Sequence, residues 1–203
     1  LGLRTSKELR GVSCIDIDLD HVPNKQIGIA KSFGKPVSSF QEMHEALSAR
    51  CTRITEKLRE RHCLAQQILV FVSTNRFKEN EPQYSNYISG KLSVHSAYAP
   101  DFIRLGSKLL KHIFKDGYKY KRIGVMVSFI VSENYAPLDF FEKVYLDDDR
   151  VKITKAMDTI NRMYGTNKIG FCSSGITQDW QMKREKLSPC YTTNWNDLVS
   201  VSC

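Results

Sequence analysis

The sequence predicts an α+β protein: a β-α-β-β-α-β domain, with a four-stranded antiparallel sheet and two helices on one face, followed by a small α/β tail. Two patterns carry this prediction. Residues 87–95 and 118–131 alternate apolar and polar side chains like strands, whereas residues 39–62 and 100–117 space apolar side chains like helices. Because such crossovers are right-handed, both helices should cover one face and leave the other open.

The first strand is expected over residues 25–32, KQIGIAKS, and runs into a turn at residues 33–36. Its small residues leave the backbone approachable on one side, as a strand that contacts phosphates requires. Simple alternation places Lys25 and Lys31 on the side of the two isoleucines. A bulge near Ala30 would be needed to turn these lysines to the open face.

The first helix is expected to start with a capping box formed by Ser39 and Glu42 and to end near His62. Its apolar stripe faces the core and comprises Phe40, Met43, Leu47, Cys51, Ile54 and Leu58. Its other side carries cations that are expected to be solvated, namely Arg50, Arg53, Lys57 and Arg61. The second helix is expected between Pro100 and Gly117, with a similar apolar stripe.

The two middle strands are expected over residues 67–74 and 87–95, joined by a polar loop. Along the second of them, the side chains expected on the open face are Tyr87, Ser89, Lys91, Ser93 and His95. On the last strand, alternation places Tyr120 and Arg122 on the open face and Phe129 with the core valines.

Charge is concentrated in the predicted sheet domain. The whole chain carries +8, and residues 25–131 contain eighteen basic and eight acidic residues. Residues 132–150 are acidic, with six carboxylates against two cations. This distribution is typical of a domain that binds a polyanion through a surface from which the following linker is repelled.

The pattern predicts four segments: a short helix and tether over 1–24, the basic sheet domain over 25–131, the linker over 132–150, and the tail over 151–203. Gly11 should close the short helix of the first segment. In the tail, a helix ended by Gly165 should precede a short strand over residues 168–172.

The residues give little support for a metal site or for redox chemistry. Asp16, Asp18 and Asp20 alternate, which could suggest a magnesium site but favours the solvated side of an extended tether. The six cysteines lack zinc-ligand spacing and are expected to be reduced thiols. No apolar run is long enough to span a membrane, and the first residue is not Met, so we expect part of a longer cytoplasmic protein.

No pairing of nucleophile and base and no glycine-rich phosphate loop is present, so no catalysis is expected from these residues alone. The basic domain instead predicts contacts to the phosphate backbone of a nucleic acid. The candidate residues for these contacts are Lys31, Ser32, Lys35, Ser73, Arg76, Lys78, Ser89, Lys91, Ser93, His95, Lys121 and Arg122. Two alternatives stay open: single-stranded nucleic acid stacked on Tyr87 and Phe71, and a pure protein-interaction module.

Several short motifs together carry a resemblance. They are Arg4-Thr5 with Glu8-Leu9-Arg10-Gly11 and Cys14, Lys31-Ser32-Phe33-Gly34, Met157-Asp158-Thr159-Ile160-Asn161, Trp180-Gln181-Met182-Lys183-Arg184, Leu187-Ser188-Pro189 and Tyr191-Thr192-Thr193. With these motifs the chain resembles the C-terminal half of Y-family translesion DNA polymerases of the UmuC type, over nearly its whole length.

This resemblance implies that residues 1–24 are the end of the thumb and the tether. It also implies that residues 25–131 are the little finger, which grips damaged duplex primer-template DNA during SOS repair. The metal-binding carboxylates of such polymerases belong to the palm, so no cofactor is expected here and Mg²⁺ would bind elsewhere in the parent enzyme. It also implies a processed UmuD dimer and a recombinase filament as partners of the tail.

The resemblance further implies a sliding-clamp peptide after the little finger. Leu138, Asp139, Phe140 and Phe141 occupy its place, although Pro137 stands where the family has glutamine. The alternative is a hydrophobic anchor that folds back on the little finger. The apolar residues of the tail, Trp180, Met182, Leu187 and Tyr191, either pack a small subdomain or contact a partner.

Overall fold

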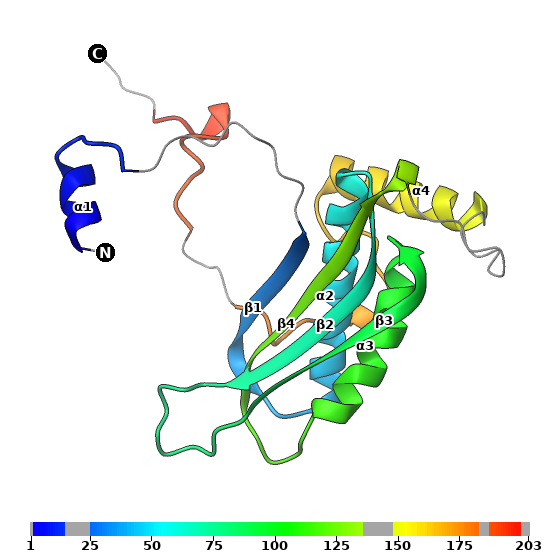
Figure 1. Ribbon diagram of the computed structural model, residues 1–203. Helices are drawn as coiled ribbons and strands as arrows, with labels where there is room; N and C mark the ends of the chain where they lie inside the picture. The colour runs from blue at the N-terminus through cyan, green and yellow to red at the C-terminus, as the bar shows by residue number, and fades with distance from the viewer. Residues whose placement is uncertain (1, 15–24, 136–147, 183–186, 200–203) are drawn as a thin grey trace.

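The computed structural model describes residues 2–14, 25–135, 148–182 and 187–199. Its central unit is a four-stranded antiparallel sheet in the order β1-β4-β2-β3 (Figure 1). The longer elements are α1 (Gly2–Leu9), β1 (Gln26–Val37), α2 (Phe40–Glu60), β2 (Cys63–Thr74), β3 (Ser85–Ser96), α3 (Ala99–Ile113), β4 (Tyr120–Ser132) and α4 (Asp148–Tyr164). Three short 3-10 turns complete them: η1 (Glu133–Tyr135), η3 (Cys172–Ser174) and η4 (Trp195–Asp197).

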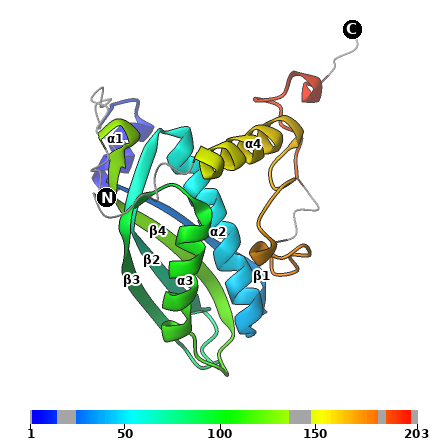
Figure 2. The same ribbon diagram turned by 90° about the vertical axis from the view of Figure 1, so that its right-hand side faces the viewer.

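Helices α2 and α3 lie side by side on one face of the sheet, and the other face is open, as predicted (Figure 2). The apolar stripe of α2 meets sheet rows such as Ile27, Val127 and Ile68, and these side chains are buried. Burial of this stripe provides the main driving force for packing α2 on the sheet. The helix does begin after Ser39, but the Ser39 side chain makes no capping hydrogen bond, so the predicted capping box does not form.

Arg50 corrects the prediction that the cations of α2 are solvated. It is only 4% exposed, and its guanidinium donates to the carbonyl oxygens of Ala46 (2.7 Å) and Lys31 (2.9 Å). The same group lies 5.3 Å from the ring centres of both Phe33 and Trp180. Burial lowers the pKa of Arg50 to about 10, so the group stays protonated at neutral pH.

Tyr120 is buried, whereas alternation placed it on the open face. The register of β4 shifts against both neighbouring strands between Arg122 and Tyr120, and this irregularity reverses the side on which the chain presents Tyr120. The Tyr120 hydroxyl donates to the Lys115 carbonyl oxygen (3.0 Å) and accepts from the Lys115 amide (2.8 Å). This pairing satisfies the buried hydroxyl.

Phe129 departs from alternation in the opposite direction. It was expected in the core but is 53% exposed, because its φ of 52° lies in the left-handed region. Such a backbone is uncommon for a bulky residue and turns the ring out of the core. The next residue, Ile130, packs against the core instead and pairs with the buried Ala65.

An ion pair joins α4 to the sheet domain. Asp158 accepts from Nε (2.7 Å) and Nη2 (2.8 Å) of Arg59, while Nη1 of Arg59 donates to the carbonyl oxygen of Ala97 (2.7 Å). Such a bidentate, partly buried pair fixes the helix more firmly than a surface ion pair does.

The chain after α4 forms no strand over residues 168–172, so that prediction was wrong. The Asn161 side chain hydrogen-bonds both backbone groups of Ile169, at 2.9 Å each, which removes them from any sheet ladder. The chain instead turns through η3, which packs against α2.

The tail then returns to β1 through Trp180. This side chain is 6% exposed and meets the ring of Phe33 edge to face, with the centroids 6.0 Å apart. The Gly34 amide donates to the Trp180 carbonyl oxygen (3.0 Å). A Cβ at Gly34 would lie 2.5 Å from the carbonyl oxygen of Gln181, so only glycine permits this close approach.

We predict that Gly34→Ala displaces the Trp180 segment while the sheet domain stays folded. In a Trp195→Phe background Trp180 is the only tryptophan, since the chain has two, and selective excitation of tryptophan reports on it alone. The added methyl group would collide with backbone, so Trp180 emission should shift to the red and acrylamide should quench it more strongly. Gly28→Ala is the matched control, because a Cβ there comes no closer than 3.9 Å to other atoms. Equal quenching in both variants would contradict the packing described above.

Candidate nucleic-acid interface

The open face of the sheet consists of four rows of side chains, each crossing all the strands in the order β1, β4, β2, β3. In strand order, the rows are Gln26–Ser128–Gln67–Lys91, Gly28–Met126–Leu69–Ser89, Ala30–Gly124–Phe71–Tyr87 and Ser32–Arg122–Ser73–Ser85. The first and last rows are polar, and the two between them are largely apolar. The face is therefore an apolar band with a polar row on each side.

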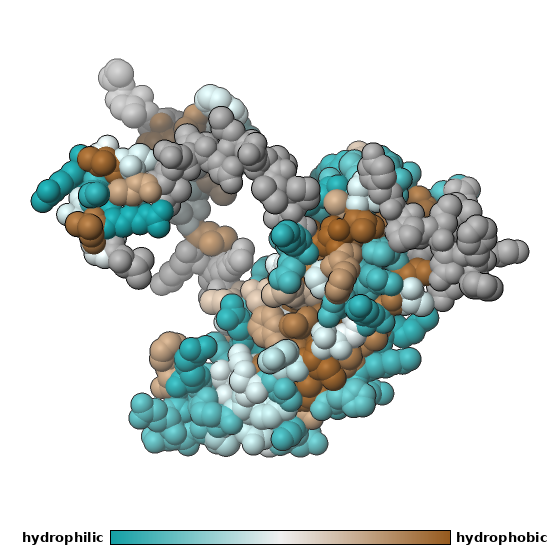
Figure 3. All heavy atoms as spheres, in the orientation of Figure 1, coloured by the Kyte–Doolittle hydropathy of each residue, from teal (hydrophilic) through white to brown (hydrophobic). Residues whose placement is uncertain are grey.

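The apolar band is flat near its centre. The Phe71 ring lies over Gly124, where a Cβ would collide with the ring. Tyr87, next to Phe71 in the same row, is 71% exposed. Figure 3 shows pale and brown spheres over the middle of the sheet, with teal spheres around them. Such a surface offers contact to apolar or stacked groups rather than to charge alone.

The open face is less basic than the sequence suggested. Within the four rows, Lys91 and Arg122 carry the charge, and no carboxylate is present. The +10 excess of residues 25–131, eighteen cations against eight acids, therefore lies mainly on loops, edges and helices. The absence of acids among these rows still leaves the face compatible with phosphate.

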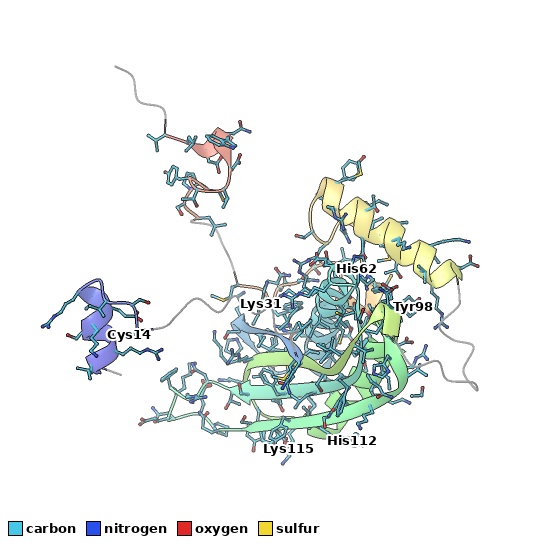
Figure 4. The ribbon with its side chains drawn as sticks, turned by 45° about the horizontal axis from the view of Figure 1, so that its top comes forward. Cys14, Lys31, His62, Tyr98, His112 and Lys115 are labelled. Carbon is cyan, nitrogen blue, oxygen red and sulfur yellow. The ribbon has the colours of Figure 1, made fainter. Side chains whose placement is uncertain are left out.

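Five of the predicted DNA-binding residues lie together on this face: Ser32, Ser73, Ser89, Lys91 and Arg122. Lys31 does not join them, because it pairs with the buried Ile123 and so belongs to the helix side, at the exposed edge of β1 (Figure 4). The bulge in β1 lies between Ser32 and Val37 rather than near Ala30. Lys35 is exposed within that irregular stretch.

The remaining predicted residues are at the periphery. Arg76 and Lys78 lie on the exposed loop between β2 and β3, where Lys78 pairs with Glu81 (3.1 Å). Lys121 donates a hydrogen bond to the carbonyl oxygen of Phe33 (2.7 Å), so its ammonium group binds β1 within the protein.

Ser93 and His95 lie where the pairing of β3 with β2 becomes irregular, beyond Lys91. Desolvation lowers the pKa of His95, so its ring is neutral at pH 7 and adds no positive charge there. The predicted clamp residues, Leu138, Asp139, Phe140 and Phe141, lie outside the described residues.

Sequence reasoning missed Gln26, Gln67 and Phe129 as surface residues of this face. A signal for the two glutamines was present, because alternation along β1 and β2 places them on the open face. Phe129 gave no such signal, because its exposure depends on a left-handed backbone. Its ring centre lies 4.5 Å from the Lys91 ammonium, a cation–π contact at one corner of the face.

The described ranges contain neither a cluster suited to a metal ion nor a helix suited to a membrane. There, no group of three or more His, Cys, Asp or Glu side chains is placed to hold a metal ion. No described helix has the length and apolar character needed to cross a bilayer. The described cysteines, Cys14, Cys51, Cys63, Cys172 and Cys190, are unbridged.

Comparison with known proteins places these features in a family. Residues 24–140 match the impB/mucB/samB family C-terminal domain, and residues 152–201 match a domain of unknown function, DUF4113. A solved structure, the insertion ternary complex of Dbh DNA polymerase, aligns with a TM-score of 0.43 and 12% identity over 53% of this chain and 29% of that one.

Curated relatives match nearly the whole chain. Protein UmuC of Salmonella typhimurium is 36% identical over 98% of this chain and 47% of its own length. Proteins SamB and ImpB of the same species are 36% and 34% identical over 96% of this chain and 46% of their lengths. The chain thus spans about half the length of these relatives. It belongs to the impB/mucB/samB family, and its sheet domain is the C-terminal domain of that family.

Proposed function

We propose that this chain is the DNA-gripping and partner-recruiting C-terminal part of an error-prone translesion DNA polymerase of SOS repair and mutagenesis. Its membership of the impB/mucB/samB family supports this role, as does its resemblance to UmuC-type polymerases. The observation that carries the proposal is the open face, where two polar rows without carboxylates flank a flat apolar band. The open face lies on duplex primer-template DNA.

The spacing of the two polar rows suits a duplex groove. Ser32 and Gln26 are six residues apart on β1, as are Arg122 and Ser128 on β4, which corresponds to about 20 Å along an extended strand. The major groove of B-DNA is about 12 Å wide. Side chains of the two rows therefore reach the phosphates on both sides of one groove, and the apolar band faces its interior. Hydroxyl, amide and cationic groups bind phosphate without reading sequence.

Chemistry at the primer end is assigned to the palm of the parent polymerase, which holds Mg²⁺ outside this chain. The little finger contributes affinity and register. Contacts of this kind raise the lifetime of the complex without adding a reacting group.

Recruitment is assigned to the segments after the sheet. Residues 138–141 are the proposed peptide for the sliding clamp, and the tail is the proposed contact for a processed UmuD dimer and a recombinase filament. Trp180 is used in packing on β1, whereas Trp195 is 87% exposed and Leu187 and Tyr191 are exposed as well. The distal tail, rather than Trp180, is thus the better partner surface. The proposed location is the cytoplasm.

A second candidate is a protein-interaction module without DNA binding, which the exposed apolar side chains of the distal tail favour. Duplex binding separates the two candidates. Absence of measurable binding to duplex DNA at low salt would exclude the first and leave the second.

We predict that duplex affinity falls with salt with a log-log slope near −4 to −5, as about five phosphate contacts require. Lys91→Ala and Arg122→Ala should each reduce the steepness of this slope by about 1. Both variants should weaken duplexes of unrelated sequence equally, as measured by fluorescence anisotropy.

The control for these variants is Lys57→Ala, which removes a cation from α2 on the opposite side of the sheet. Its salt slope should match that of the unmodified chain. Losses that depend on DNA sequence would argue against backbone contact.

A second prediction concerns the proposed clamp peptide. The double variant Phe140→Ala/Phe141→Ala should abolish binding to the sliding clamp, because aromatic side chains anchor such peptides in apolar pockets. Its duplex affinity should be unchanged. If duplex affinity fell together with clamp binding, the two residues would instead anchor the linker to the sheet domain.

A further inference from the structure

A groove of about 340 Å³ runs along the outer edge of β3, between this strand and α3. Its lining is basic. The cations are Lys91 from β3, Arg104 and Lys108 from α3, and Arg150 from α4, and Ser93 of β3 lies among them. Arg150 also stacks on Tyr98 at 5.2 Å, which holds the start of α4 beside this edge. Asp101 is the single carboxylate in the lining, and it accepts a hydrogen bond from Ser96 (2.9 Å).

The cations of α3 differ from those of α2 in their partners. Arg104 and Lys108 lie one turn apart and are exposed, and within the described residues neither has a carboxylate at ion-pair distance. On α2, by contrast, Arg53 pairs with Glu56 and Arg59 pairs with Asp158. Lys111 adds a further exposed cation in the last turn of α3, and Lys115, labelled beside His112 in Figure 4, follows the helix and lies over the Tyr84 ring at 5.0 Å. Cations without carboxylate partners, such as Arg104 and Lys108, favour binding of an external anion.

The backbone of β3 is also available along this groove. β3 is the last strand of the sheet, so its outer side has no neighbouring strand. Its pairing with β2 is interrupted between Lys91 and Ser96. The edge therefore offers peptide groups as well as cations to a ligand that lies along it.

The groove begins where the open face ends, because Lys91 belongs to both. Lys91 closes one polar row of the open face and also lines the groove. Phe129 stands at this junction with its ring in contact with the Lys91 ammonium. A bulky residue held exposed in a left-handed backbone stores strain, and such strain is concentrated at functional sites.

We propose that this groove binds the phosphate backbone of single-stranded DNA where it leaves the duplex, with a base stacked on Phe129. This inference rests on the proposed function of the open face. The groove lies between one strand and one helix, so it admits a single backbone, whereas a duplex, whose major groove alone is about 12 Å wide, touches only its rim. Cations along a track, here with Arg104 and Lys108 exposed, and an aromatic platform at its entrance are the usual elements of single-strand binding.

The test compares the full chain on two DNA probes by fluorescence anisotropy: a blunt duplex, and the same duplex with a single-stranded dT overhang. The overhang should raise affinity at low salt and steepen the salt slope by about 1.4 for two further phosphate contacts, at about 0.7 per contact. Between about 50 and 200 mM salt the advantage of the overhang should therefore shrink about sevenfold.

The double variant Arg104→Ala/Lys108→Ala should remove this advantage and leave blunt-duplex binding unchanged. Arg53→Ala/Lys57→Ala is the matched control, since it removes the same pair of residue types at the same spacing from α2. Phe129→Ala should also reduce the advantage of the overhang. The reduction should be the same for overhangs of different base sequence, because stacking tolerates any base.

The outcomes separate this inference from the proposed function. Failure to bind the blunt duplex would refute the proposed function. Normal blunt-duplex binding with no gain from the overhang would refute the groove alone, as would an equal loss on both probes in Arg104→Ala/Lys108→Ala. Binding of poly-glutamate in place of the overhang would assign the groove to an acidic protein segment and overturn the proposal.

Discussion

The buried guanidinium of Arg50 ties together three parts of the chain that are distant in sequence. A buried charge is tolerated only when hydrogen bonds and polarisable groups replace its hydration. Arg50 obtains these from two carbonyl oxygens on α2 and β1 and from the faces of Phe33 and Trp180. It thereby fixes the irregular end of β1 against α2 and provides the surface on which the tail is seated. The Trp180 segment thus lies against the end of β1 at Phe33 and Gly34.

The sheet domain could be predicted from sequence because its local patterns agree with its tertiary environment. The apolar stripe of α2 is buried as expected, and both helices cover one face. The failures at Tyr120 and Phe129 have a common cause. Alternation assumes an uninterrupted strand, so it misplaces Tyr120 beyond a register shift and Phe129 at a left-handed backbone. Arg50 was misjudged for a different reason: its burial depends on a tail segment more than a hundred residues away, at Trp180.

The candidate site was predictable only in part. Alternation identified Arg122 and Lys91 as open-face residues, but the rows that join them depend on strand order, which no local pattern reveals. Counting charges along the sequence identified the domain that carries the basic excess. It could not show on which surface of that domain the cations lie. Only the fold shows that Arg104 and Lys108 lie together beside the β3 edge, while the open face carries two cations, Lys91 and Arg122, both in its outer rows.

The two middle rows of the open face carry no charge, which has a physical consequence under the proposed function. A polymerase must hold its duplex and still let it advance by one base pair after each addition. Strong charge contacts in the middle of the face would create deep minima at fixed positions, because Coulomb interactions at close range are steep. An apolar band with polar rows at its margins, by contrast, gives a contact that changes little as the duplex moves. Placing Arg104 and Lys108 beside the β3 edge then provides electrostatic attraction without a barrier to sliding.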